Sequence, residues 1–373
     1  MASVRREQYP YLQTHRIKTY PICQVRAGMQ IGRAVTSPDG ESVLAEGVTL
    51  TQGILEALTM WQIDCIEILE PIPVGEQIRT GIKPPKEIQT ADDFTQIYDE
   101  TITIMNRSFS LMRYFKQVPV QELKDLARTN LFPLIRNTGI VNLLFNMQRV
   151  DDYTFHHSVN VAAVAGLIGK WLKLPEGQQN ELIQAGLLHD IGKSQIPLEI
   201  LNKPGKLTEQ EFREMQRHSE YGYAMIKDSE EVSTAVKQAV WQHHERMDGT
   251  GYPLGTGGEK IGLFGRIIAV ADLYDALTSD RVYRRRMTPF EAMDLLMQER
   301  FNKVDTHICT VFLDQMRNFF IGNQVKLTDG REAEIVFMPP EATRPLVKTQ
   351  DGAFIDLSRR RELDIVELLV FAS

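Results

Sequence analysis

The stretch Leu187-Leu188-His189-Asp190-Ile191-Gly192-Lys193 places a histidine beside an aspartate within an apolar run. This pair offers a metal an imidazole nitrogen and a carboxylate oxygen from one turn of backbone, and the two carboxylate oxygens can hold two cations at once. The apolar neighbours predict that the turn is fixed in a core, and Gly192 would let the chain leave it sharply. A His-Asp pair alone is a weak signal, because most such pairs are surface residues or helix ends.

The composition is that of a globular protein with more than one domain. The chain has 373 residues, of which 43% are hydrophobic and 24% charged, and this length predicts two or three domains. No basic N-terminal segment precedes an apolar run, and no apolar stretch approaches the roughly 18 residues that span a bilayer. We therefore expect a cytoplasmic protein without a membrane span.

Charge and cysteine content argue against several classes of protein. The formal net charge of −7 disfavours a broad nucleic-acid-binding surface, so an anionic ligand would be held by a local patch or by metal ions. Cys23, Cys65 and Cys309 lie far apart and form no CxxC motif. This spacing argues against a disulfide framework and against a structural zinc site.

The pattern along the chain predicts a mainly α-helical protein with a small module at each end. We expect an α+β module at residues 1–70, a Pro- and Gly-rich linker at 71–91, a helical domain at 92–321 and a β module at 322–373. The expected elements of the two modules are strands at 29–35, 42–45 and 65–69, a turn at 37–40, a helix from its cap Thr51 to Trp61, hairpins at 325–337 and 346–357, and a last strand at 364–369.

A long amphipathic helix is expected after the linker. Its apolar residues recur every three or four positions, at Phe94, Tyr98, Ile102, Met105, Phe109 and Met112. We favour packing of this stripe against its own domain over a dimer seam or a signalling helix. A homodimer and signalling protein partners stay open. Residues 120–150 continue the helical pattern, with Gly139 as a break.

Six of the eight histidines gather in the middle of the chain, at His156, His157, His189, His218, His243 and His244. Asp190 and Asp272 lie in apolar surroundings, where an ionised group without a partner is costly. Any single histidine is best explained as a satisfied core residue or a helix cap, whereas the set indicates a metal site. Imidazole and carboxylate ligands without thiolate suit Fe, Mn or Zn. If Asp190 were shared, two metals about 3.5–4 Å apart could split a phosphoester.

The central region resembles an HD-GYP domain, the branch of the HD metal-dependent phosphohydrolases that cleaves cyclic di-GMP. The resemblance covers about residues 150–290. It rests on five motifs, which are Tyr153-Thr154-Phe155-His156-His157-Ser158-Val159-Asn160-Val161, the stretch Gly186–Lys193, His218-Ser219-Glu220-Tyr221-Gly222, His243-His244-Glu245-Arg246-Met247-Asp248-Gly249-Thr250-Gly251-Tyr252-Pro253, and Ala271-Asp272-Leu273-Tyr274-Asp275-Ala276-Leu277-Thr278-Ser279-Asp280-Arg281. The fold that it implies is a helical HD-type catalytic domain.

The resemblance implies a centre of two divalent transition metals, with Fe or Mn favoured and Zn, Ni or Co open. The implied ligands are His157, His189, Asp190, His218, His243, His244 and Asp272, with Asp190 as the bridge and a catalytic residue. Some family members hold a third metal through a glutamate four residues before the first ligand. Tyr153 stands there in this chain and cannot serve as that carboxylate. Asp152 is a poor substitute, because it lies about 100° further round a helix. His156 is expected to be structural.

The resemblance also assigns residues to the substrate and to the loop after the histidine pair. Lys193 is expected to be catalytic by adding positive charge beside the scissile phosphate, and Tyr252, Arg281 and Arg284 are expected to bind substrate. Gly249 and Gly251 would allow tight turns near the metals. The remaining residues of the loop are expected to support it, namely Arg246, Glu245, Asp248, Gly249, Gly251 and Pro253.

The implied function is a bacterial cyclic di-GMP phosphodiesterase. Hydroxide generated between two metals would attack phosphorus, giving linear pGpG and, after a second cut, GMP. Two alternatives stay open. One is a hydrolase of a related cyclic dinucleotide such as cyclic GMP-AMP. The other is a catalytically silent module that binds a cyclic dinucleotide and signals to a partner.

Overall fold

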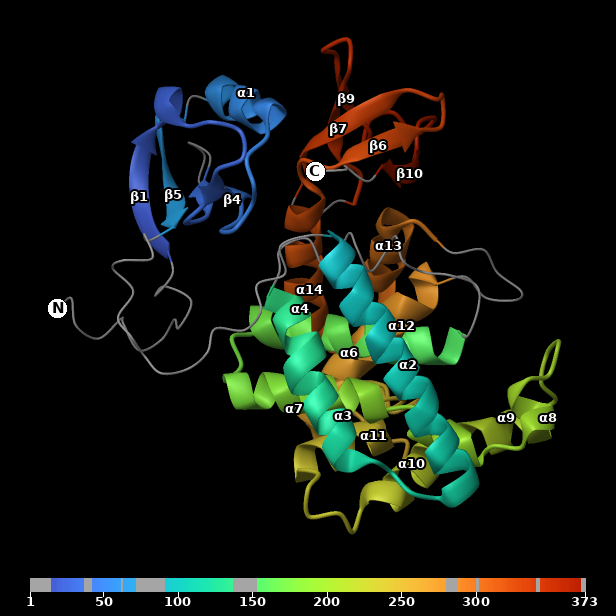
Figure 1. Cartoon of the computed structure of the whole chain (residues 1–373). Coiled ribbons are helices and arrows are strands. Elements are labelled where there is room, and N and C mark those ends of the chain that lie inside the picture. The colour runs from blue at the N-terminus through green and yellow to red at the C-terminus, as the bar shows by residue number, and fades with distance from the viewer. Residues whose placement is uncertain are drawn as a thin grey trace. The chain divides into compact units, whose positions relative to one another are not determined.

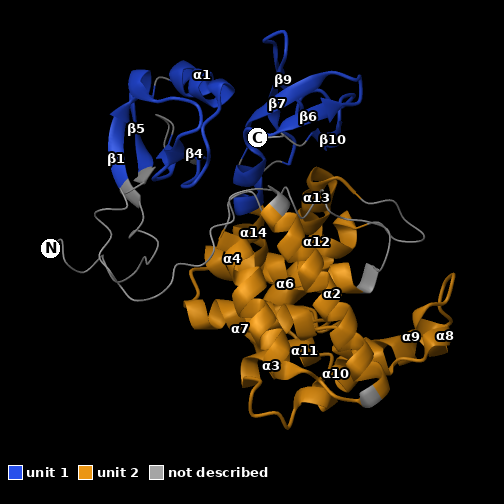
Figure 2. Ribbon diagram, viewed as in Figure 1, with its two compact units in different colours: residues 1–84, 314–373 blue, residues 85–313 orange. Residues whose placement is uncertain are grey.

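The computed structural model describes residues 15–36, 42–61, 63–71, 91–136, 153–279, 287–299, 302–339 and 343–369. The chain divides into two compact units (Figure 2), one of residues 85–313 and the other of residues 1–84 with 314–373. Among the described residues, no helix has both the length and the apolar character that crossing a membrane requires.

The unit of residues 85–313 is helical, as the sequence predicts (Figure 1). Its elements are α2 (Ala91–Phe115), α3 (Val120–Leu126), a π-helical turn η4 (Ala127–Leu131), α4 (Phe132–Arg136), α6 (Tyr153–Trp171), α7 (Glu176–Leu188), the 3-10 turn η5 (Ile191–Gln195), α8 (Leu198–Leu201), α9 (Glu209–Gln216), α10 (His218–Ile226), α11 (Thr234–Gln242), η6 (Gly258–Lys260), α12 (Leu263–Thr278), α13 (Pro289–Glu299) and the start of α14 (Thr306–Phe320).

The core of this unit is built around α6 and α7. Helix α6 is apolar on nearly all sides, and Val159, Ala162 and Ile168 are among its fully buried residues. A helix of this kind must be surrounded by other elements, and α6 packs against α7, α12, α2 and α4. A Cβ atom at Gly186 would lie only 2.4 Å from Ala162 Cα, so glycine is what lets α7 approach α6 this closely.

Helix α2 packs against its own domain, which confirms the favoured explanation of its apolar stripe. Phe94, Tyr98, Met105 and Met112 are buried, and α2 contacts α6 and η5. The expected helical region from residue 120 begins with α3, η4 and α4. Its continuation at 137–150, including the break expected at Gly139, lies outside the described residues.

The second unit contains the strands. Its N-terminal elements are β1 (His15–Pro21), η2 (Ile22–Gln24), β2 (Gln30–Ile31), β3 (Val35–Thr36), β4 (Ser42–Leu44), α1 (Gln52–Met60) and β5 (Cys65–Pro71). These strands form a three-stranded sheet in the order β1-β5-β2 and a separate β3-β4 pair, all antiparallel. Thr51 caps α1 as predicted, with its side chain accepting from the Ile54 amide at 3.2 Å.

The prediction of a single strand at 29–35 was wrong. Its first part, β2, pairs with β5, and its last part, β3, pairs with β4. The break falls at Gly32, whose amide donates to the Glu67 carbonyl at 2.7 Å and where a Cβ would lie 3.0 Å from the Ile68 carbonyl carbon. The chain therefore leaves one sheet there and joins the other. The turn expected at 37–40 lies outside the described residues, as do residues 72–90 of the linker expected at 71–91, whose two end residues belong to β5 and α2.

The C-terminal part of this unit is a five-stranded antiparallel sheet. Its strands follow the order β10-β6-β7-β8-β9 and are β6 (Gln324–Leu327), β7 (Glu332–Phe337), β8 (Leu346–Thr349), β9 (Phe354–Asp356) and β10 (Ile365–Leu369). The two predicted hairpins correspond to β6-β7 and β8-β9. The small modules expected at the two ends of the chain therefore fall in one compact unit, and an ion pair between Glu56 and Lys348 joins α1 to β8.

Candidate metal centre

The His-Asp pair lies where one helix stops and a tighter turn begins. His189 is the C-terminal cap of α7, and Asp190 is the N-terminal cap of the 3-10 turn η5. Both side chains are buried. A Cβ atom at Gly192 would lie 1.8 Å from the His218 carbonyl oxygen, so glycine brings η5 directly against α10. Gly192 adopts no left-handed φ, so close packing rather than the predicted sharp exit accounts for it.

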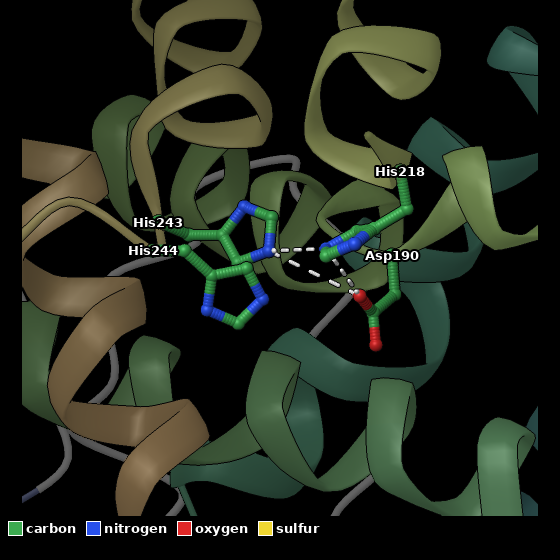
Figure 3. A group of neighbouring side chains, drawn as sticks. All are labelled: Asp190, His218, His243 and His244. Atoms are coloured by element: carbon green, nitrogen blue, oxygen red, sulfur yellow. Dashed lines mark hydrogen bonds and ion pairs between the residues drawn. The ribbon is translucent and has the colours of Figure 1, made fainter. Parts of the chain in front are cut away.

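The structure brings together all seven residues that the resemblance implied as ligands. Their donor atoms form two groups, in each of which the atoms lie within 4.8 Å of one another. The first group (Figure 3) contains Asp190 from the turn and three histidines from α10 and the end of α11. The full membership is Asp190, His218, His243 and His244 in the first group and His157, His189 and Asp272 in the second.

Asp190 lies between the two groups. Its Oδ1 is 3.3 Å from His218 Nε2 and 3.9 Å from His243 Nε2. Its Oδ2 is 3.6 Å from His157 Nε2 and 3.3 Å from His189 Nε2. Each oxygen of this one carboxylate therefore faces a different group.

Backbone carbonyls fix the orientation of three of the histidine rings. In each case Nδ1 lies within hydrogen-bond distance of the carbonyl three residues earlier, at 2.7 Å for His189, 2.7 Å for His218 and 2.9 Å for His243. A carbonyl only accepts, so Nδ1 carries the proton and each Nε2 presents a lone pair to the centre. This is the tautomer that a metal-ligating histidine needs.

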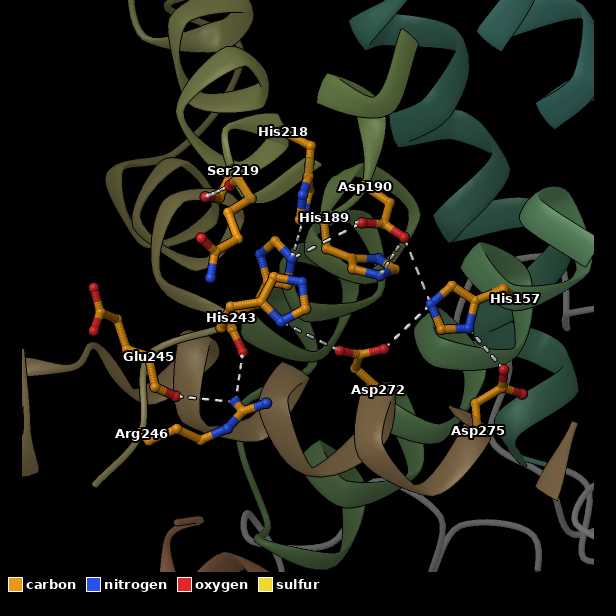
Figure 4. Close-up of polar contacts among 12 residues, drawn as sticks. His157, His189, Asp190, His218, Ser219, His243, Glu245, Arg246, Asp272 and Asp275 are labelled. Atoms are coloured by element: carbon orange, nitrogen blue, oxygen red, sulfur yellow. Dashed lines mark hydrogen bonds and ion pairs between the residues drawn. The ribbon is translucent and has the colours of Figure 1, made fainter. Parts of the chain in front are cut away.

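His157 is oriented by a carboxylate instead. Its Nδ1 is 2.7 Å from Asp275 Oδ2, and its Nε2 is 3.2 Å from Asp272 Oδ1 (Figure 4). Burial alone would lower the pKa of His157, but the hydrogen bonds to Asp272 and Asp275 outweigh burial and raise this pKa to about 9. Without a metal, His157 is thus an imidazolium that donates its Nδ1 proton to Asp275 and its Nε2 proton to Asp272.

The other groups hold the protonation states that metal ligation requires. Burial lowers the pKa of His218 to about 4 and lowers those of His243 and His244 well below the usual value. Burial opposes ionisation of Asp190 and Asp272, but in each case neighbouring cations and hydrogen bonds outweigh it and hold the pKa well below its ordinary range. Neutral imidazoles beside ionised carboxylates are ready to bind a cation.

Two buried atoms at the centre have no hydrogen-bond partner among the described residues. They are His189 Nε2 and Asp190 Oδ1. Burying a polar atom without a partner is costly, and such atoms call for an explanation such as an ion. One imidazole nitrogen and one carboxylate oxygen pointing into a cluster of further nitrogen and oxygen donors fit divalent transition metals. The donor set therefore fits a metal site on its own chemistry.

Lys193 lies beside the carboxylate of Asp190. Its Nζ donates a hydrogen bond to Asp190 Oδ2 and forms an ion pair with it. The side chain is 23% exposed, whereas that of Asp190 is 3% exposed. Lys193 is therefore the more accessible member of this ion pair.

The loop after the histidine pair is held by Glu245. This buried carboxylate accepts from the Leu254 amide at 2.7 Å and from the Thr256 amide at 2.9 Å. Asp248 accepts from the Thr250 amide and hydroxyl within the loop. Pro253 follows Tyr252 in this loop through a cis peptide bond.

Two glycines of the loop allow tight backbone turns, as the sequence suggested. Gly249 has a φ of +78°, and a Cβ at Gly251 would lie 2.4 Å from the His244 carbonyl oxygen. The loop is thereby folded back on the histidine pair, and the Tyr252 ring centroid lies 4.6 Å from that of His244. The Arg246 side chain contacts the backbone where the loop begins, and its Nη1 donates to the carbonyls of His243 and Glu245.

Arg281 and Arg284 lie outside the described residues, as do Asp280, Asp152 and the side chain of Tyr153. His156, expected to be structural, has its Nδ1 3.1 Å from the Tyr98 hydroxyl.

Sequence reasoning missed three residues that support His157. Asp275 and Asn160 are buried and hydrogen-bonded to each other at 2.9 Å, and Tyr98 of α2 donates to Asn160. The signal that could have found two of them is spacing. Asn160 follows His157 by three residues and Asp275 follows Asp272 by three, so each pair shares one helix face.

Comparison with known proteins agrees with this geometry. The family model described as HD domain matches residues 123–308, a range that includes all seven clustered residues. Residues 123–308 thus form an HD domain. The domain therefore begins in α3 and leaves α2 outside the matched region.

Two curated relatives illustrate the similarity of the HD domain. A cyclic di-GMP phosphodiesterase of Pseudomonas aeruginosa is 40% identical over 219 residues, which are 59% of this chain and 53% of that protein. A 3′3′-cGAMP-specific phosphodiesterase of Vibrio cholerae is 39% identical over 189 residues, which are 48% of this chain and 43% of that protein. The chain thus spans about half the length of these relatives.

A solved structure shares the fold. An HDG"Y"P protein from Bdellovibrio bacteriovorus superposes with a TM-score of 0.52 at 17% identity, covering 81% of this chain and 99% of that chain. At this identity the likeness concerns the fold alone.

Proposed function

We propose that the chain is a metal-dependent phosphodiesterase that hydrolyses cyclic di-GMP to linear pGpG. The observation that carries the proposal is the position of Asp190, whose two oxygens face two separate groups of imidazole and carboxylate donors. A centre of this kind suits a pair of metals sharing one carboxylate. The names of the relatives from Pseudomonas aeruginosa and Vibrio cholerae support a cyclic dinucleotide as substrate.

Two divalent transition metals would be held by the seven clustered residues, with Fe or Mn favoured by the nitrogen and oxygen donors. His218, His243 and His244 would bind one metal and His157, His189 and Asp272 the other, with Asp190 shared. When bound, such metals supply Lewis-acid stabilisation of charge on a phosphodiester and make water a nucleophile near neutral pH.

The protein's own contribution is to hold these donors ready. The carbonyls that fix His189, His218 and His243 spare the site a reorientation of the rings when a cation arrives. Burial keeps competing water away from the donors and strengthens every charge interaction among them.

Lys193 is proposed to be catalytic through its charge. Its Nζ donates to Asp190 Oδ2, an oxygen that would also be available to hold a metal. The Lys193 side chain is partly exposed, and a phosphate oxygen of the substrate would accept a hydrogen bond from its ammonium. Lys193 would thus exchange one anionic partner for another as the site fills.

Tyr252, Arg281 and Arg284 are proposed to bind the substrate. The Tyr252 ring lies beside His244, and a ring at the edge of a metal centre can pack against a guanine base. The two arginines would pair with phosphate or with the guanine edge, both of which suit a bidentate guanidinium.

A second candidate substrate is 3′3′-cGAMP, favoured by the relative from Vibrio cholerae at nearly the same identity. The two substrates differ in one base. The metal centre contacts phosphate, so it cannot distinguish them, and the choice would be made by residues that touch the bases.

The test is product analysis with both dinucleotides. Protein purified without oxygen is supplied with Mn²⁺ or Fe²⁺ and incubated with each dinucleotide, and the products are separated by chromatography. We expect linear pGpG from cyclic di-GMP, and none with the Asp190→Ala variant. Faster cleavage of 3′3′-cGAMP would favour the second candidate, and dinucleotide binding without a linear product would identify a silent binding module instead.

A further inference from the structure

A relay of hydrogen bonds joins helix α2 to the metal-binding residue His157. The Tyr98 hydroxyl donates to Asn160 Oδ1 at 2.8 Å, and Asn160 Nδ2 donates to Asp275 Oδ1 at 2.9 Å. Asp275 Oδ2 in turn lies 2.7 Å from His157 Nδ1. Tyr98, Asn160, Asp275 and His157 are all buried.

The direction of each bond in the relay is fixed by chemistry. An ionised Asp275 can only accept, so the amide nitrogen of Asn160 must face it and the amide oxygen must face Tyr98. The Tyr98 hydroxyl must then donate to that oxygen. Burial raises the pKa of Tyr98, as does the nearby Asp275, so the hydroxyl keeps its proton at neutral pH. One arrangement of protons therefore satisfies all four groups.

The relay sets the side-chain positions of the metal centre, not only its protons. Asp275 is one turn beyond Asp272 on α12, and Asn160 is one turn beyond His157 on α6. The hydrogen bond between Asn160 and Asp275 ties these two faces together beside the bond from His157 to Asp272. An Asn160 amide held by Tyr98 keeps Asp275, and with it the His157 ring, in one orientation.

Helix α2 is anchored to the site a second time. Arg113 donates to the Lys193 carbonyl at 3.0 Å and to the Ile196 carbonyl at 3.2 Å, on the turn that carries Asp190. The Tyr98 ring is stacked on Phe94, with centroids 6.0 Å apart. Both ends of α2 therefore hold Tyr98 in place, although α2 lies outside the region that matches the HD domain family.

We propose that Tyr98 is a positioning residue for the metal centre, acting on His157 through Asn160 and Asp275. The inference rests on the metal centre of the proposed function. Mutation of a residue that supports a metal-ligating histidine typically weakens metal affinity about 10- to 100-fold. Asp275 contacts His157 directly, so its mutation should weaken metal affinity by this amount. Tyr98 acts through two intervening residues, so its mutation should have a smaller effect.

The test compares Tyr98→Phe with Thr101→Val. The first variant removes only the hydroxyl of the relay and keeps the ring. The control removes a hydroxyl from a fully buried residue three positions along the same helix, where Thr101 donates to the Ile97 carbonyl and accepts from Asn130. The measurements are the dissociation constant for Mn²⁺, by titration of metal-depleted full-length protein, and the Tm.

We expect Tyr98→Phe to weaken Mn²⁺ binding about 3- to 10-fold and Asp275→Asn about 10- to 100-fold. Thr101→Val should lower the Tm without changing the affinity for Mn²⁺. Asn160→Ala breaks the relay from a different helix, and it should weaken binding at least as much as Tyr98→Phe. The inference is overturned if Tyr98→Phe binds Mn²⁺ within twofold of the wild type, or if Thr101→Val weakens binding equally.

These outcomes separate the inference from the proposed function. A wild-type protein that binds Mn²⁺ but cleaves no dinucleotide contradicts the proposed function, and the affinities of the variants still decide the role of Tyr98. A wild-type protein that binds no Mn²⁺ contradicts both.

Discussion

Gly192 and His218 approach so closely that a Cβ atom on the glycine would lie 1.8 Å from the histidine's carbonyl oxygen. This contact presses the turn that carries Asp190 against the helix that begins with His218. Asp190 Oδ1 and His218 Nε2, two potential ligand atoms from different segments of the chain, thereby lie 3.3 Å apart. We therefore expect the metal centre to require the absence of a side chain at position 192.

Replacing Gly192 with alanine should therefore damage both stability and metal binding. The added methyl must push η5 away from α10, which costs about 1–3 kcal/mol or more in a packed core, and the shift separates Asp190 from His218. Thermal unfolding and metal analysis check this. Gly177→Ala is the control, because a Cβ there meets nothing within 4 Å and should leave stability unchanged or raise it slightly. Normal metal content in Gly192→Ala would show that the close contact is not needed.

Asp190→Ala and Lys193→Ala should separate metal binding from chemistry. Asp190 faces both groups of donors, so its loss should remove metal and abolish hydrolysis. Lys193 contributes positive charge but no metal-ligand atom, so Lys193→Ala should keep its metal while hydrolysis slows by roughly 10²-fold or more. Elemental analysis and single-turnover rates measure the two effects. Equal loss of metal in both variants would contradict this division of roles.

Glu245→Gln should affect the substrate rather than the metal. Glu245 accepts from the amides of Leu254 and Thr256, and a glutamine can offer only one accepting oxygen. One of these two partly buried amides would lose its partner, at a cost of about 1–3 kcal/mol, and the loop that carries Tyr252 would loosen. We expect KM to rise with metal content unchanged. A lower kcat at an unchanged KM would mean that Glu245 acts on the centre directly.

The lowered pKa of Lys170 predicts that protein stability depends on pH through a group outside the metal site. Burial, with a smaller contribution from Arg136, lowers the pKa of Lys170 from 10.5 to about 8. Between these values the unfolded chain binds one more proton than the folded chain, so stability contributed by this residue rises with pH from about 8 to 10.5. Below pH 8 both states are protonated and the full cost of burying the charge is present.

Lys170→Met should therefore gain free energy of unfolding relative to the wild type below pH 8, and this gain should shrink toward pH 10.5. Denaturant unfolding at several pH values measures it. Lys227→Met at an exposed position is the control, because it leaves the partly buried ammonium of Lys170 in place. A difference between Lys170→Met and wild type that is constant across this pH range would contradict the prediction.

The local signals in the sequence predicted most of the fold. Hydrophobic periodicity and capping residues such as Thr51 identified α1, α2 and the C-terminal hairpins, because these depend on neighbours along the chain. The strand expected at 29–35 failed for the opposite reason. Its division between two sheets is decided by pairing with β4 and β5, which no local pattern encodes.

The candidate site was predicted unevenly for a similar reason. The clustered residues could be named from motifs, because chemistry restricts which residue types can bind a metal. Tyr98 could not be found in this way. Its hydroxyl meets Asn160 only because α2 packs on α6, and in the sequence it is simply one apolar residue of the stripe.

The most direct test of the metal centre is elemental analysis of full-length protein purified without oxygen. We expect about two transition-metal ions per chain, mostly iron or manganese, with almost none in Asp190→Ala. Wild-type protein that reproducibly carries no metal, one ion or three ions per chain would contradict a centre of two metals shared by Asp190.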